Sequence, residues 1–90
     1  MTTAFEWDDA KATINREKHG LAFEDAPLVF KGQTVTRPDL RQHYGEPRFL
    51  TFGTLHGRVV VIAHTFRNDA TRIISMRYAN AREQARFRQA

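Results

Sequence analysis

Alternation of apolar and polar residues is clearest between residues 48 and 77, where it predicts consecutive β-strands. Residues 48–54 alternate as one strand, and residues 58–77 contain two further segments rich in β-branched side chains, which suit a pleated, half-buried surface. His56-Gly57 and Asn68-Asp69 separate the segments. Asn and Asp tolerate the left-handed backbone of hairpin turns, so we expect antiparallel strands joined by tight turns.

The length of these two turns sets the strand register. Two residues in each turn give the cross-strand pairs Phe52 with Val61, Leu50 with Ala63, Ala63 with Ile74, and Val61 with Met76. This face is wholly apolar, and we expect it to lie under the helices. The opposite face is mixed, and its residues are Phe49, Thr51, Ile62, His64, Ile73, Ser75 and Arg77. A change of one residue would exchange the two faces.

Two helices are predicted before the strands. Asp8 or Asp9 can cap the first helix, whose last turn is followed by Gly20, a common helix stop. Residues 23–30 form a second, short helix, and Pro27 is compatible with its first turn. The polar loop at residues 37–47 is long, and such loops are often functional.

The remaining segments complete one α+β domain, residues 1–90. Asn80 and Glu83 fit a capping box that begins a C-terminal helix, and residues 5–7 and 34–36 are candidates for short strands. We therefore predict an antiparallel sheet of three or four strands, with the two N-terminal helices on one face and a C-terminal helix. A chain of 90 residues is too short for two comfortable domains.

Composition restricts the compartment. The chain has no cysteine, which excludes disulfides and thiolate metal sites. No apolar run approaches the roughly 20 residues of a membrane span. The first residues lack the basic and apolar regions of a signal peptide. We expect a cytoplasmic protein with no membrane partner.

Charge is distributed unevenly along the chain. The formal net charge is +4, but residues 1–30 carry −3 and residues 31–90 carry +7. Eleven of the fourteen cations are arginine, whose planar guanidinium matches phosphate bidentately. This pattern favours a nucleic acid or an acidic protein as partner, although a GC-rich genome would enrich arginine too.

The polar residues allow RNA cleavage without a metal ion. No metal-ligand spacing and no glycine-rich phosphate loop occurs, so we expect no metal and no cofactor. Cleavage by the 2′-hydroxyl needs a base, an acid for the leaving 5′-oxygen, and fixed positive charge for the phosphorane. The candidates are Arg67 and Arg77 for the charge, Glu46 or a histidine for the base, and His19, His43 or His64 for the acid.

Several candidates have a structural alternative. Glu83 can be a helix cap that pairs with Arg77, and His64 can be an ordinary sheet histidine. Trp7 can belong to the core, although an exposed tryptophan can stack on a base. The predicted RNA-binding residues are Lys18, Arg48, Arg72 and Trp7.

Short motifs follow one another in a distinctive order. They are Phe5-x-Trp7-Asp8, Lys11, Asn15, Lys18-His19-Gly20, Phe23, Phe30, Gly45-Glu46-x-Arg48, Thr65-x-Arg67, Arg72-Ile73-Ile74-Ser75-x-Arg77 and Ala79-x-x-x-Glu83. The ordered set resembles the BrnT family, and the resemblance covers about residues 5–87. The polar positions carried over are Lys18, His19, Glu46, Arg48, Arg67, Arg77 and Glu83.

This resemblance implies a function. BrnT proteins are toxins of bacterial type II toxin–antitoxin systems, with a RelE-like fold and ribonuclease activity. By resemblance, this chain is an endoribonuclease that slows translation and growth, and a BrnA-type antitoxin neutralises it. RNA is then the substrate, and operator DNA is a further partner through the antitoxin complex. Phe87 departs from the pattern because it replaces a tyrosine whose hydroxyl could help catalysis.

The residues alone leave three interpretations open. The first is the ribonuclease toxin. The second is a basic module, or a repressor subunit, that binds nucleic acid without cutting it. The third is an inactive remnant whose site residues serve the interface with its partner.

Overall fold

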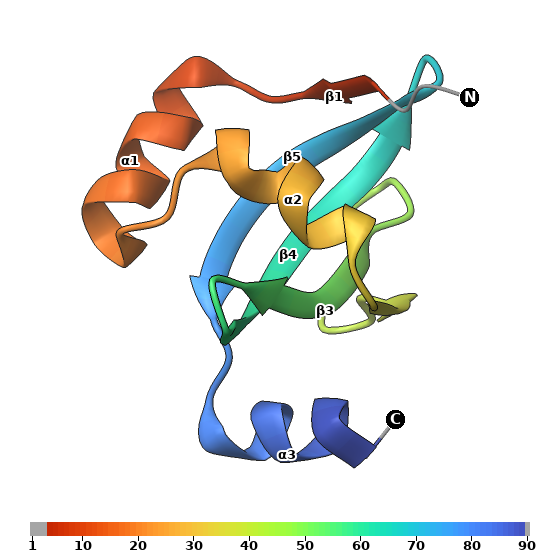
Figure 1. The fold of residues 1–90 in the computed structure, drawn as a ribbon. Coiled ribbons are helices and arrows are strands. Elements are labelled where there is room, and N and C mark those ends of the chain that lie inside the picture. The colour runs from red at the N-terminus through yellow and green to blue at the C-terminus, as the bar shows by residue number, and fades with distance from the viewer. Residues whose placement is uncertain (1–3, 90) are drawn as a thin grey trace.

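The chain forms one mixed β-sheet with helices on both sides (Figure 1). The computed structural model describes residues 4–89. Its elements are β1 (Ala4–Glu6), α1 (Asp9–His19), a 3-10 turn (Phe23–Asp25), α2 (Ala26–Lys31), β2 (Val35–Pro38), β3 (Phe49–Leu55), β4 (Arg58–Arg67), β5 (Ala70–Tyr78) and α3 (Ala81–Gln89). The strand order is β1-β5-β4-β3-β2. No helix in this part of the chain is long and apolar enough to cross a membrane.

The predicted α+β class and its helices are confirmed, but the predicted number of strands is wrong. Within residues 4–89 the sheet has five strands rather than three or four, and it is not wholly antiparallel. β1 pairs in parallel with β5, from Ala4 opposite Ala70 to Glu6 opposite Arg72. A strand of three residues carries too little alternation to reveal its partner or its direction.

The turns are confirmed, whereas the register between β4 and β5 is wrong by one residue. The left-handed backbone expected at the turns occurs at His56 (φ 50°), Asn68 (φ 50°) and Asp69 (φ 65°). The pairs Phe52–Val61 and Leu50–Ala63 form as predicted. Beyond the pair His64–Ile73, a β-bulge inserts one residue into β5, so Ala63 pairs with Ser75 and Val61 with Arg77.

Each face of the sheet has its own apolar core. The helix face is the one on which α1 and α2 pack, and its strand residues are Leu55, Val60, Ile62, Ile73 and Met76. The opposite face packs on Phe87 of α3, and its strand residues are Leu50, Phe52, Val59, Val61 and Ala63. The predicted faces are therefore exchanged on β3 and β4, because the set around Val61 lies away from α1 and α2.

Gly53 explains why the N-terminal helices pack on this face. Apolar residues lie on both sides of β3 and β4, so alternation alone does not choose between them. A Cβ at position 53 would lie 2.7 Å from Cγ1 of Val29 and 3.2 Å from Cγ2 of Thr34. The absence of a side chain at Gly53 thus allows α2 to approach the backbone of β3.

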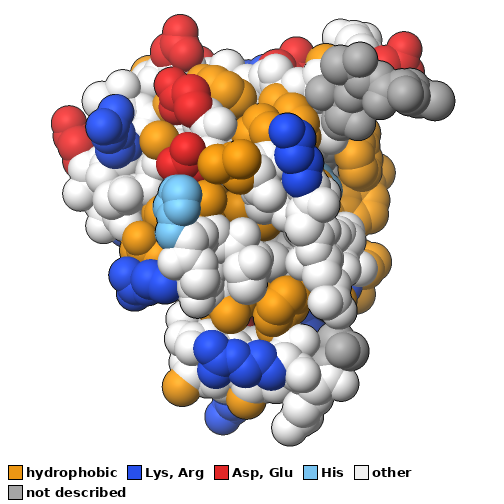
Figure 2. Space-filling model, in the orientation of Figure 1, with side chains coloured by type: hydrophobic (Ala, Val, Ile, Leu, Met, Phe, Trp, Pro, Cys, Tyr) orange, Lys and Arg blue, Asp and Glu red, His pale blue; other side chains and the backbone are white. Residues whose placement is uncertain are grey.

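The face opposite α1 and α2 carries four arginines. Arg37 on β2, Arg67 on β4, and Arg72 and Arg77 on β5 alternate to this side with the residues of the second core. We call this surface the arginine face. From the other side, Figure 2 shows acidic side chains grouped toward α1, whereas the basic side chains of α3 are arginines. The charge division along the sequence thus becomes a division in space.

A buried amide joins α1 to the sheet. The Nδ2 of Asn15 donates to the carbonyl of Met76 at 3.0 Å and to that of Leu21 at 3.3 Å. Its Oδ1 accepts from the Met76 N–H at 3.1 Å. Both polar groups of Met76 point to the same side of β5. The Asn15 side chain therefore continues the hydrogen bonding of that edge beyond the end of β1.

We predict that Asn15→Ala lowers the free energy of unfolding by about 2 kcal/mol, because it leaves buried backbone groups of Met76 without partners. The matched control is Ile14→Ala, since Ile14 is 62% exposed on the same helix whereas Asn15 is 6% exposed. The control should change stability by no more than about 0.5 kcal/mol. Urea denaturation measures both, and equal losses would contradict the role given to Asn15.

Candidate functional site

One candidate site lies where the 39–48 loop meets the end of β4. Nη2 of Arg67 donates to Oε1 of Glu46 at 3.0 Å, and Nε of Arg48 donates to Oε2 of the same carboxylate at 3.4 Å. We call these three residues the Glu46 cluster. The Thr65 hydroxyl donates to the carbonyl of Pro47 and holds the loop on β4. The cluster thus joins residues that are 21 positions apart in the sequence.

A hollow of about 460 Å³ lies beside the Glu46 cluster. His43, Tyr44 and Phe49 line it together with Glu46 and Arg48. The Arg48 guanidinium carbon lies 4.1 Å from the centre of the Tyr44 ring. The hollow is therefore bounded by a carboxylate, a guanidinium, an imidazole and aromatic rings.

A buried carboxylate, that of Asp39, holds the loop that forms this hollow. Asp39 accepts from Nε and Nη2 of Arg41 at 2.8 and 2.7 Å and from the Tyr44 hydroxyl at 3.0 Å. The hydrogen bonds from Arg41 hold the pKa of the Asp39 carboxyl well below its usual range. This arrangement fixes the ends of the segment that carries His43.

The electrostatics of Glu46 are set by its two arginines. The hydrogen bond from Arg67 is the main cause that lowers the pKa of Glu46, and Arg48 adds to it. Glu46 is therefore ionised at neutral pH and can accept a proton. Its basicity rises if Arg67 moves from the carboxylate to another anion.

A second cluster ties β5 to α3. Nη1 and Nη2 of Arg77 donate to the two oxygens of Glu83 at 2.8 and 2.9 Å. Glu83 also accepts from the Asn80 N–H at 3.0 Å, and its own N–H donates to Oδ1 of Asn80 at 2.8 Å. This is the predicted capping box, and the hydrogen bond from Arg77 is the main cause that lowers the pKa of Glu83 to about 2.

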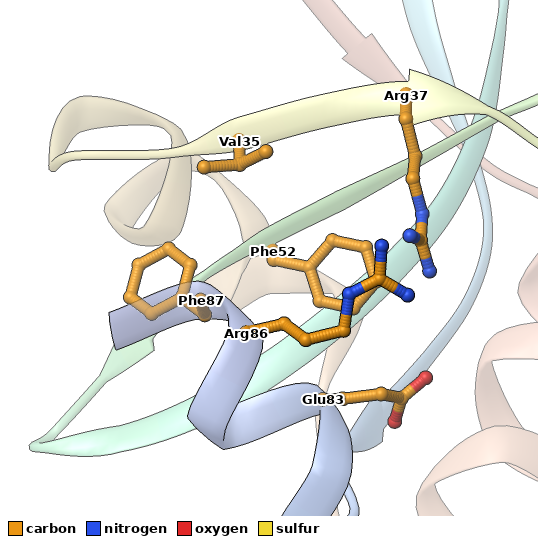
Figure 3. A pocket seen from close by; sticks show the side chains of 6 residues that line it. All are labelled: Val35, Arg37, Phe52, Glu83, Arg86 and Phe87. Carbon is orange, nitrogen blue, oxygen red and sulfur yellow. The ribbon is translucent and has the colours of Figure 1, made fainter. Parts of the chain in front are cut away.

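A groove of about 250 Å³ opens beside Glu83 on the arginine face. Figure 3 shows Arg37 reaching from β2, and Arg86 from α3, toward the space at the Phe52 ring. The Arg37 guanidinium carbon lies 4.9 Å from the centre of that ring. Val35 and Phe87 complete the apolar lining. The groove therefore combines an aromatic floor with two guanidinium groups.

The two clusters lie at opposite ends of the arginine face. Arg67 pairs with Ala70 at the start of β5, and Arg77 lies seven residues further along that strand. At about 3.3 Å per residue, the two arginines are roughly 20 Å apart. Arg67 and Arg77 therefore cannot contact the same phosphate group.

The other predicted residues are dispersed. Lys18 and His19 end α1 on the helix face, and among residues 4–89 no hydrogen bond or ion pair joins them to either cluster. Arg72 pairs with Glu6 at 3.4 Å, beside β1. Trp7 packs edge-on against Phe23 at 6.1 Å between ring centres, so it belongs to the core.

His64 fits its structural alternative. It is 1% exposed, and its Nε2 lies 2.7 Å from the Thr51 hydroxyl. Burial lowers the pKa of His64 to about 4, so the ring is neutral at neutral pH. His64 is buried and does not line the hollow beside the Glu46 cluster.

The sequence prediction missed Arg37, Arg86 and Tyr44. Arg37 follows Val35 by two residues, so the alternation of β2 could have placed it on the same face. Arg86 follows Glu83 by three residues on α3, which puts both on one side of a helix. The contact of Tyr44 with Arg48 could not be predicted from the sequence, because it depends on the path of the loop between them.

The chain matches, over residues 7–83, the model of the family described as "Ribonuclease toxin, BrnT, of type II toxin-antitoxin system". The matched segment includes the Glu46 cluster, Arg77 and Glu83 and ends before Arg86. No curated protein matches the chain.

The lowered pKa of Glu83 predicts a stability change in acid. A carboxyl whose pKa falls from 4.5 to about 2 on folding stabilises the fold above its unfolded pKa and loses that contribution as the pH falls toward 2. Wild type should exceed Glu83→Gln by about 2 kcal/mol in unfolding free energy at pH 6, and the difference should vanish near pH 2. Glutamine retains capping ability. Denaturant titrations that show a constant difference would contradict this assignment.

Proposed function

The chain belongs to the BrnT family of ribonuclease toxins of type II toxin–antitoxin systems, and we propose that its arginine face binds single-stranded RNA and that the Glu46 cluster cuts it. The observation that carries this proposal is the placement of Arg37, Arg67, Arg72 and Arg77 on one face of the sheet. Guanidinium groups bind phosphate bidentately, so several of them on one face can hold different phosphates of one RNA strand. RNA lying along β5 would meet both clusters.

Glu46 is the better candidate for the general base. The oxygens of Glu83 are engaged by Arg77 and by the Asn80 backbone, and Glu83 also begins α3. Glu46 instead binds two side chains at the edge of an open hollow. When Arg67 binds a phosphate of the RNA instead of Glu46, the pKa of the Glu46 carboxyl rises. The carboxylate is then a stronger base while the substrate is bound.

The reaction needs no metal ion in this proposal. Glu46 removes the proton from the 2′-hydroxyl, whose oxygen attacks the phosphorus. Arg67 and Arg48 stabilise the charge of the phosphorane, and the bond to the 5′-oxygen breaks. His43, which lines the same hollow, donates the proton to the leaving oxygen. We give this role to His43 rather than His19, because His19 lies at the end of α1 on the helix face. The products are a 2′,3′-cyclic phosphate and a 5′-hydroxyl.

Arg77 then acts at a different point on the RNA. It lies roughly 20 Å from Arg67 along β5 and would hold the strand by a phosphate several nucleotides from the cut. Arg37 and Arg86 flank it through the groove at Glu83. Arg77 is accordingly a positioning residue, and Arg72 lies between the two sites on the same strand.

In the cell, cutting RNA would slow translation and arrest growth in the cytoplasm. The type II family implies an antitoxin protein as partner. We propose that this partner is of the BrnA type, that it covers the arginine face, and that the complex can bind operator DNA. Glu6, Glu46 and Glu83 are each paired with an arginine of this face. Carboxylates that serve only to hold arginines in place suit the alternative of a basic module that binds nucleic acid without cutting it.

We predict that Arg67→Ala and Arg77→Ala each abolish growth arrest. Loss of one donor to a transition-state oxyanion costs about 10²–10³ in rate, so Arg67→Ala should lower kcat by this factor. Arg77→Ala should mainly raise KM, because it removes a remote phosphate contact. Arg67→Lys and Arg77→Lys should be impaired too, since lysine lacks the bidentate geometry.

Cleavage of single-stranded RNA by the purified protein in the presence of a chelator measures these effects. Thermal unfolding must show that each variant is folded, and Arg58→Ala is the control because Arg58 stacks on Tyr78 at the other face. Folded alanine variants that cut at the wild-type rate would make both arginines structural. A folded wild type that binds RNA but never cuts it would support the binding module instead.

We predict that the product of the neighbouring gene co-purifies with this chain. Stable complexes bury at least about 1,200 Å² in total, and the arginine face with α3 offers a surface for such an interface. Co-expression followed by affinity capture tests this. If the chain arrests growth when expressed alone, yet does not associate with that product, the proposed partner is wrong.

A further inference from the structure

Phe66 is an exposed aromatic ring beside the proposed cleavage site. It is 60% exposed near the end of β4, directly before Arg67. Strand alternation places its ring on the helix face and the Arg67 side chain on the arginine face. The next residues, Asn68 and Asp69, are polar and exposed. Phe66 thus stands at the sheet margin with most of its ring open to solvent.

The Phe66 ring is held in place from beneath. Its centre lies 5.4 Å from that of Phe49 and 5.4 Å from that of His64, which it meets edge-on. His64 is fixed by Phe30 at 5.3 Å between ring centres and by the Thr51 hydroxyl at 2.7 Å. A ring supported in this way loses little conformational freedom when a ligand covers its outer side.

Phe49 connects this ring to the Glu46 cluster. Phe49 contacts Phe66 and also lines the hollow that contains Glu46 and Arg48. The aromatic pair and the cationic cluster are therefore adjacent parts of one region. Aromatic side chains beside a basic groove are the usual means of holding single-stranded nucleic acid, because every base has a face that can stack.

We propose that Phe66, supported by Phe49, stacks on an unpaired base of the RNA next to the phosphate held by the Glu46 cluster. This inference rests on the proposed function and adds a base-binding subsite to it. An RNA base fits the site better than a protein side chain does, because the adjoining Glu46 cluster supplies guanidinium groups for the phosphate of the same nucleotide strand.

The test uses short 2′-O-methyl oligonucleotides, which lack the attacking 2′-hydroxyl and remain uncut. A series in which one base at a time is replaced by an abasic site is titrated against four proteins: wild type, Phe66→Leu, Phe66→Trp and the control Leu28→Ala. Leucine keeps apolar bulk without an aromatic face. Leu28 is 51% exposed on α2 and has no assigned role.

We expect Phe66→Leu to lower affinity for the intact strand by roughly 5- to 100-fold, as for loss of one stacked base, and Phe66→Trp to retain it. Removing one particular base should weaken binding to wild type, Phe66→Trp and Leu28→Ala but leave Phe66→Leu unaffected. This loss of additivity identifies the stacked pair.

The inference is overturned if Phe66→Leu binds the intact strand as tightly as wild type, if no abasic position distinguishes the two, or if wild type does not bind at all. Its failure is separable from that of the proposed function. Wild type that cuts unmodified RNA without any coupling at Phe66 retains the ribonuclease and loses the subsite. Wild type that shows the coupling but never cuts retains the subsite and loses the catalytic assignment.

Discussion

The packing of α1 against the sheet depends on the hydrogen bonds of the Asn15 side-chain amide. β1 covers only the first part of β5, and beyond Arg72 the outer edge of β5 would be open. Asn15 fills this position by bonding both backbone groups of Met76 and the carbonyl of Leu21. An unpaired strand edge invites pairing with other chains. One side chain thus closes the edge, orients α1 and fixes where the chain turns toward α2.

Much of the fold could be predicted from the sequence, because helix caps and turn residues mark the ends of the elements. Asp8 and Gly20 bound α1, and Asn80 with Glu83 begins α3, because each signal acts over a few residues. The bulge after Ile73 was not readable, since no residue type requires it. The choice of face was ambiguous for a different reason: both sides of β3 and β4 carry apolar residues, and the close approach of Val29 to Gly53 exists on one side alone.

The candidate site was predictable in its residue types and not in its geometry. RNA cleavage requires positive charge and a base, and the sequence analysis selected Arg67, Arg77 and Glu46 for these roles. Their distribution into two clusters follows from the strand register, which places Arg67 and Arg77 at opposite ends of β5. Lys18 and His19, the predicted site residues on α1, lie on the helix face, so the sheet separates them from the arginine face. The exposure of Phe66 could not be predicted from the sequence, because it depends on how much of the ring the neighbouring strands cover.

The double role of Glu83 links the formation of α3 to its attachment. The same oxygen, Oε1, accepts from the Asn80 backbone and from Arg77. A helix of nine residues is marginal in water without such support. When Arg77 leaves Glu83, the helix therefore loses its anchor to β5 and keeps only the capping box of Asn80 and Glu83. α3 would then behave as a separate unit of local unfolding, with amide protons that exchange well before those of the sheet.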